Sequence, residues 1–152
     1  MKTLLAALAF SGALLTSAPT VWAGPAEEAQ TLYARFAAAQ NARDLERVKA
    51  TLSASPRFLW VSDGKSFWGR ETMIARMSSF QEAEVWRVEP GLDKAVAVEV
   101  GADAAFLHLP LVLVIGSKER PDRLRFLVSV LCSRTFEGWR IAALFTTTEK
   151  PE

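Results

Sequence analysis

The side chains that could do chemistry are few, and His108 stands out because it is the chain's single histidine. It lies between Leu107 and Leu109, in the middle of an apolar stretch. An imidazole that points into a pocket can act as a general acid or base near neutral pH, with Tyr33 as its hydrogen-bond partner or as an acid. The alternative is a neutral core histidine that is satisfied by one hydrogen bond. His108 is therefore the candidate catalytic residue if the protein is an enzyme.

Cys132 is the only cysteine, which excludes an intramolecular disulfide. It lies within the apolar segment LVSVLCSRTF, so we expect a buried, inert thiol rather than a reactive one. Arg134 follows two residues later and could clamp a ligand carboxylate, or simply pair with Glu137. One histidine, one cysteine and no HxH or carboxylate cluster argue against a metal site. We expect neither a metal nor a cofactor.

The first 23 residues have the pattern of a secretory signal peptide. Lys2 supplies a positive start, and Leu4–Leu15 is an apolar and small-residue run that is shorter than the roughly 20 residues of a membrane span. Cleavage after Ala18 would leave Pro19 first, which signal peptidases disfavour, so we predict cleavage after Ala23. The mature domain is then 24–152, located in the periplasm or secreted. The alternative is a retained N-terminal anchor.

The charge balance excludes some partners. The chain has 18 basic and 17 acidic side chains, and loss of Lys2 with the signal peptide leaves no net charge. Nucleic-acid binding needs a basic face, so we expect no nucleic-acid partner. We also expect no membrane span after processing.

Three helices are predicted ahead of the strands. Pro25, Glu27 and Glu28 favour the start of a helix over 26–41, which carries one apolar face. Asp44 is the expected N-cap of a short second helix that ends near Leu52. A third helix is expected at about 71–80, with Met73, Ile74 and Met77 on one side.

The remaining segments are β-branched and apolar, and turn residues separate them. Asp63-Gly64 predicts a hairpin between strands at 57–61 and 66–68. Five further strands are expected at 85–88, 95–100, 104–115, 124–136 and 139–147. Helices followed by a run of antiparallel strands indicate an α+β domain whose helices pack on one face of a sheet.

Both alternating sets of residues in 104–115 are apolar, which predicts that both faces of this strand are covered. The helices can cover only one face. We interpret Leu107, Leu109, Leu111 and Leu113 as the outer set, and we expect that face to form a homodimer interface.

Three segments together resemble the nuclear transport factor 2-like superfamily, in particular its SnoaL-like and ketosteroid isomerase-like members. They are FAAAQNARDL at 36–45, FWGRE at 67–71 and GWRI at 138–141. The resemblance covers about 26–148. It implies a strongly curved antiparallel sheet wrapped around three N-terminal helices, which is a cone-shaped, cystatin-like roll with an apolar pocket. Such proteins are often homodimers through the outer face of the sheet.

The resemblance does not extend to the isomerase catalytic residues. The positions that would hold a tyrosine, a general-base aspartate and a protonated acid fall on Phe36, Trp60 and Cys132. An allylic proton shift needs a base within hydrogen-bond reach of the substrate, and Trp60 cannot serve as one. Ketosteroid isomerase activity is not expected.

The same resemblance implies an apolar, aromatic pocket that suits a small apolar or aromatic molecule. The implied pocket-facing residues are Tyr33, Phe36, Trp60, Phe106, His108, Val112, Val128, Val130, Cys132, Ile141 and Phe145, with Arg134 near the strand end. The alternative is that these side chains fill the cone as core.

The sequence therefore predicts an exported, non-enzymatic small-molecule-binding or interaction domain. One alternative is a SnoaL-like isomerase, dehydratase or cyclase that uses His108 as acid or base. Another is a structural partner whose sheet face docks a second envelope protein.

Overall fold

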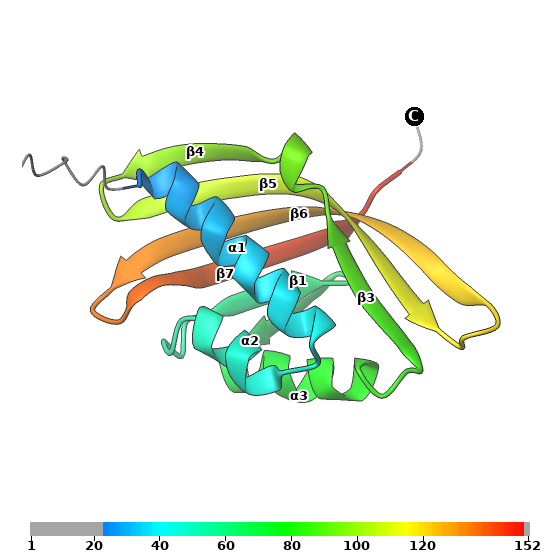
Figure 1. The fold of residues 1–152 in the computed structure, drawn as a ribbon. Helices are drawn as coiled ribbons and strands as arrows, with labels where there is room; N and C mark the ends of the chain where they lie inside the picture. Colours follow the sequence, from blue (N-terminus) through cyan, green and yellow to red (C-terminus); the bar gives the residue numbers. More distant parts are fainter. Residues whose placement is uncertain (1–22, 151–152) are drawn as a thin grey trace, which may run out of the picture.

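A computed structural model describes residues 23–150 (Figure 1), so that all but Ala23 of the predicted signal peptide lies outside the described residues. The helices are α1 (Pro25–Asn41), α2 (Leu45–Thr51) and α3 (Arg70–Phe80), with a 3₁₀ turn at Leu92–Lys94. The strands are β1 (Leu59–Ser62), β2 (Lys65–Trp68), β3 (Val85–Pro90), β4 (Val96–Gly101), β5 (Ala104–Gly116), β6 (Pro121–Thr135) and β7 (Gly138–Thr148). The predicted elements are all present, with bounds that shift by at most three residues. Within 23–150, no helix is both long and apolar enough to cross a membrane.

The strands form one curved sheet of seven strands, and the three helices lie on its concave side (Figure 1). The order is β2-β1-β7-β6-β5-β3, and β4 pairs with the part of β5 that β3 leaves free. The pairs are antiparallel except β1 with β7, which is parallel. The predicted α+β roll is confirmed, with one parallel pair that makes the sheet mixed.

Local sequence signals explain the turns that join these elements. The Asp44 carboxylate accepts a hydrogen bond of 3.0 Å from the Arg47 backbone N–H, which caps α2 as predicted. Asp63 and Gly64 both have positive φ angles, 52° and 69°, as the tight β1–β2 hairpin requires. This hairpin turn brings the Asp63 carboxylate to the cavity described below.

The face of β5 that the sequence pattern predicted to be outside points toward the helices. Leu107 and Leu109 are fully buried in the core, and Leu111 and Leu113 line a cavity. Phe106 lies on the opposite, outer face and is 37% exposed. The predicted leucine-lined dimer face is therefore wrong. The alternation of side chains divides the residues of β5 between two faces. Because both sets are apolar, it does not show which face packs against the helices.

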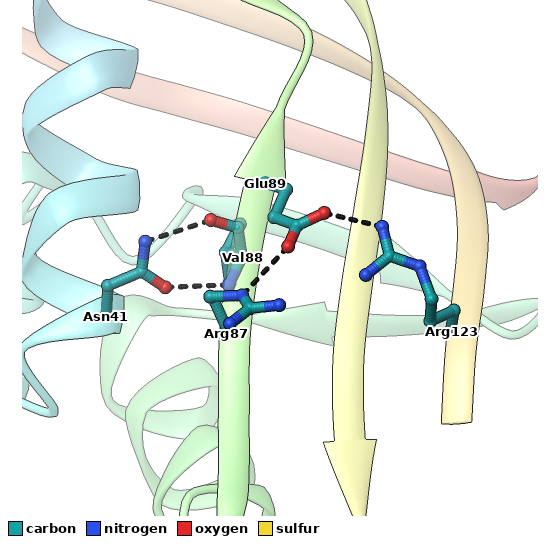
Figure 2. Close-up of polar contacts among 5 residues, drawn as sticks. All are labelled: Asn41, Arg87, Val88, Glu89 and Arg123. Atoms are coloured by element: carbon teal, nitrogen blue, oxygen red, sulfur yellow. Dashed lines mark hydrogen bonds and ion pairs between the residues drawn. The ribbon is translucent and has the colours of Figure 1, made fainter. Parts of the chain in front are cut away.

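Strand β3 lies at the edge of the sheet, and the Asn41 side chain occupies its free side (Figure 2). The Asn41 amide donates to the Val88 carbonyl at 2.9 Å and accepts from the Val88 N–H at 2.6 Å. Both polar groups of that edge residue are thus satisfied. On the outer face, the Glu89 carboxylate pairs with Arg87 at 2.8 Å and with Arg123 at 2.7 Å. Asn41 thus covers the β3 edge at Val88, and the Glu89–Arg123 pair links β3 to β6 across the outer face.

Candidate functional site

A cavity of about 290 Å³ lies between the helices and the concave face of the sheet. Its wall is mainly apolar and takes side chains from α1, α3 and five strands. The helices contribute Tyr33, Phe36, Gln40, Met73, Met77 and Phe80. The strands and the β1–β2 turn contribute Trp60, Ser62, Asp63, Trp86, Val88, Leu111, Leu113, Ile115, Leu124, Phe126, Val128, Leu144 and Thr146. The volume is near the lower end of the range for small-ligand pockets.

Paired aromatic rings form much of this wall. The ring centroids of Tyr33 and Phe36 are 5.6 Å apart, and Phe80 stacks on Trp86 at 6.4 Å with 12° between the planes. Trp60 packs on Phe67 at 5.1 Å. These separations are typical of favourable aromatic pairs, which hold the rings in place around the space.

Apart from Gln40 of α1, the polar residues of the wall lie where β1 and β7 run side by side, at and just after Ser62. Ser62 pairs with Thr146 in the parallel register, and Asp63 follows directly. The Trp60 indole N–H donates to the Thr146 hydroxyl at 3.4 Å. Arg76 of α3 lies behind this end rather than on the wall, and its Nη2 is 3.3 Å from Asp63 Oδ2. The cavity therefore has an apolar body and one polar end.

Tyr33 and Asp63 are the wall residues with an acidic side-chain group. Burial raises the pKa of the Tyr33 phenol above its usual value, so it stays neutral at physiological pH. The Asp63 carboxylate pairs with Arg76 and its side chain is 63% exposed. Neither arrangement provides a buried, free general base.

His108 lies on the face of β5 that points away from the cavity. It pairs in register with Ser129 of β6, and His108 Nδ1 is 3.0 Å from the Ser129 hydroxyl. Its neighbours Leu107 and Leu109 are the ones that point into the core. The prediction that His108 points into the pocket is therefore wrong. The cause is again that the inner and outer faces of β5 were assigned the wrong way round.

The other predicted pocket residues separate into two groups. Tyr33, Phe36 and Trp60 lie on the cavity wall, although their role in binding stays a prediction. Phe106 and Phe145 lie on the outer face and are 37% and 38% exposed, so their predicted inward direction is wrong. Val112 also lies on the outer face, because it pairs in register between Glu89 and Arg125.

The predicted pocket residues of β6 and β7 that point inward lie partly on the cavity wall and partly in the core. Val128 lines the cavity, whereas Val130, Cys132 and Ile141 are fully buried in the core beyond it. Burial raises the pKa of the Cys132 thiol to about 12, as expected for an inert side chain.

Arg134 lies at the hairpin end of β6 and is not on the cavity wall. Its Nε is 3.3 Å from Asp103 Oδ1, and its guanidinium lies 5.3 Å from the Trp139 ring centre. Glu137, the partner considered from sequence, pairs instead with Arg140 at 3.8 Å. A carboxylate clamp at Arg134 would have to displace Asp103.

Several wall residues were not predicted from the sequence. Met73 and Met77 were expected on one side of their helix, but nothing tied that side to a pocket. Trp86, Leu111 and Leu113 were missed because the inner and outer faces of β5 were assigned the wrong way round. Within 23–150, no group of three or more His, Cys, Asp or Glu side chains could hold a metal ion.

Comparison with known proteins gives a family and a fold. Residues 29–144 match the family described as the SnoaL-like domain. None of the curated proteins matches the chain.

Solved structures with the same fold include an uncharacterised cystatin-like protein from Caulobacter vibrioides. It is 18% identical with a TM-score of 0.71, over 84% of this chain and 91% of that one. A nuclear transport factor 2-like protein of unknown function from Shewanella oneidensis is 15% identical, with a TM-score of 0.69 over 80% and 98%. A proposed dehydratase of the same fold family from Streptomyces avermitilis is 14% identical, with a TM-score of 0.72 over 83% and 96%. At such identities the likeness shows the fold alone.

Proposed function

This chain belongs to the SnoaL-like domain family, and we propose that it is a non-enzymatic protein that encloses a small apolar or aromatic molecule. The observation that carries the proposal is the cavity of about 290 Å³ between the helices and the sheet. A filled core would leave no space of this size, since protein interiors pack as densely as organic crystals. The few polar groups at one end suit orientation of a ligand.

The arrangement of titratable groups supports binding rather than catalysis. His108, the acid or base of the isomerase, dehydratase or cyclase alternative, lies on the other side of the sheet, where it contacts Ser129. A proton cannot pass from there to a ligand in the cavity without a group between them. Tyr33 is neutral, and Asp63 is paired with Arg76.

Thermal unfolding in the presence of naphthylmethanol tests this function. The probe should raise the melting temperature, because it binds the native state and not the unfolded chain. Leu113→Trp places an indole in the cavity and should remove this shift. Val112→Trp is the matched control, because Val112 directly precedes Leu113 but lies on the outer face. The Val112→Trp variant should retain the shift in melting temperature. An equal shift in both variants, or none in the unmodified protein, would argue against the cavity as the binding site.

We also propose that residues 1–23 direct export and are removed. The pattern of Lys2, the apolar Leu4–Leu15 and Ala23 supports this proposal. Mature protein recovered from the envelope or medium should begin at Gly24 when its N-terminus is sequenced. Recovery of cytoplasmic protein that still begins at Met1 would rule out the proposal.

The outer face of the sheet supports a homodimer, though through other residues than the leucines. Two cross-strand rows run over β4, β5, β6 and β7 there: Val98, Phe106, Leu131 and Ala143, then Val96, His108, Ser129 and Phe145. We call these two rows the outer-face patch. Its large apolar side chains are 37–58% exposed. Arg123 and Arg125, nearer the start of β6, are paired within the chain with Glu89 and Glu149. A second copy would therefore meet an apolar centre.

Leu131→Glu is expected to give a monomer, because it would bury two carboxylates in a symmetric interface. Sedimentation equilibrium measures the change. Phe136→Glu is the control, since Phe136 lies outside the patch and is 99% exposed. A monomeric unmodified protein would contradict the dimer. It would favour the alternative in which the outer-face patch docks a second envelope protein.

A further inference from the structure

Arg76 is not itself a wall residue of the cavity, but it lies next to the wall at the polar end, among aromatic rings. Its guanidinium carbon lies 4.7 Å from the Phe67 ring centre, 4.8 Å from that of Phe80 and 5.8 Å from that of Trp60. Phe80 and Trp60 are themselves wall residues. An arginine stacked in this way keeps its charge and its donor geometry fixed.

The hydrogen-bonding capacity of this guanidinium is only partly used. Its Nη2 makes one contact of 3.3 Å with Asp63, which is long for a charge-assisted hydrogen bond. Its Nε is buried and has no partner among the described residues. Guanidinium groups bind carboxylates most strongly through two parallel N–H donors. Arg76 therefore has a stronger carboxylate contact available than the one Asp63 makes.

Asp63 can leave this contact. Its side chain is 63% exposed, whereas that of Arg76 is 30% exposed, so the carboxylate can turn into water while Arg76 stays between the rings. Asp63 also lines the cavity. A carboxylate that enters along the cavity would therefore reach the position that Asp63 occupies.

We propose that the cavity takes the apolar body of an organic carboxylate, whose anionic group binds Arg76 in place of Asp63. The proposal rests on the binding function above and names the chemical class of its ligand. The exchange of one carboxylate for another leaves the charge of Arg76 neutralised throughout. Ser62, which directly precedes Asp63, and its register partner Thr146 also line the cavity, and their hydroxyls are further hydrogen-bonding groups for the ligand or for water.

Naphthoate and naphthylmethanol form a matched pair of probes, because they share the ring system and differ in charge. Isothermal titration of the unmodified protein should show tighter binding of naphthoate. Arg76→Met should weaken naphthoate binding about tenfold or more and weaken naphthylmethanol binding much less, because the alcohol carries no charge. Arg123→Met, which removes a positive charge from the outer face, is the control and should change neither affinity.

Asp63→Asn gives a second test that does not remove packing from the aromatic rings. Asparagine tolerates the left-handed backbone at this position, where φ is 52°, and the amide competes less for Arg76. Naphthoate affinity should rise several-fold, whereas naphthylmethanol affinity should change much less.

Three outcomes separate the two proposals. Binding of naphthylmethanol with equal or weaker binding of naphthoate would overturn the carboxylate proposal and leave the cavity function standing. Insensitivity of naphthoate binding to both Arg76→Met and Asp63→Asn would also overturn it. Failure of both probes to bind would count against the cavity function itself.

Discussion

Leu109→Glu is expected to unfold the protein at room temperature. Leu109 is fully buried against the helix-facing core, and an unpaired carboxylate there has no charge partner. The cost of burying such a group is several kcal/mol, which is comparable with the whole stability of a domain of this size, about 5–15 kcal/mol. Circular dichroism during urea unfolding measures the effect.

Phe106→Glu is the matched control on the same strand. Phe106 lies on the outer face and is 37% exposed, so its replacement should leave the fold intact and affect only association. A folded Leu109→Glu variant together with an unfolded Phe106→Glu variant would reverse the two faces of β5 described here.

Trp60→Ala should both destabilise the protein and change its choice of ligand. The substitution removes the contact with Phe67, the hydrogen bond to Thr146 and one ring beside Arg76. Loss of a large aromatic side chain typically costs about 3–5 kcal/mol, measured as the change in free energy of unfolding in urea.

The same variant enlarges an existing cavity, so it should bind anthracenylmethanol, a larger probe than naphthylmethanol, better than the unmodified protein does. Fluorescence titration with both alcohols measures this change. A loss of stability with no gain in binding of the larger alcohol would indicate a filled core around Trp60.

The fold could be predicted largely because its turns carry strong local signals. Pro25, Asp44 and the Asp63-Gly64 pair each set a helix start or a hairpin, and each lies where expected. The parallel pairing of β1 with β7 joins segments some 80 residues apart in sequence. No local pattern reports such a pairing, so the sheet was expected to be antiparallel throughout.

The faces of β5 could not be read from that strand alone, because leucines alternate with Phe106, Pro110 and Val112. The neighbouring strand does contain the information. In β6 the polar residues Arg125 and Ser129 alternate with Phe126 and Val128, and directly opposed residues share a face. The pairing of His108 with Ser129 therefore places the histidine on the outer face. The residue pattern of β5 alone does not give this assignment.

The polar end of the cavity was also beyond the sequence. Asp63 was explained fully by its turn, and Arg76 lies on a helix 13 residues further along the chain. Their contact depends on how α3 packs on the β1–β2 hairpin, which local patterns do not specify. Tyr33, Phe36 and Trp60 were placed on the wall by the family resemblance, and their part in binding awaits experiment.

A crystal of the protein soaked with bromonaphthalene tests the central claim most directly, because bromine gives an anomalous signal that locates the ligand. We predict one strong peak per chain inside the cavity, between Trp60, Met77 and Val128. The central claim is contradicted if the cavity shows no peak and side chains fill the space, or if bromine is found only on the outer face of the sheet.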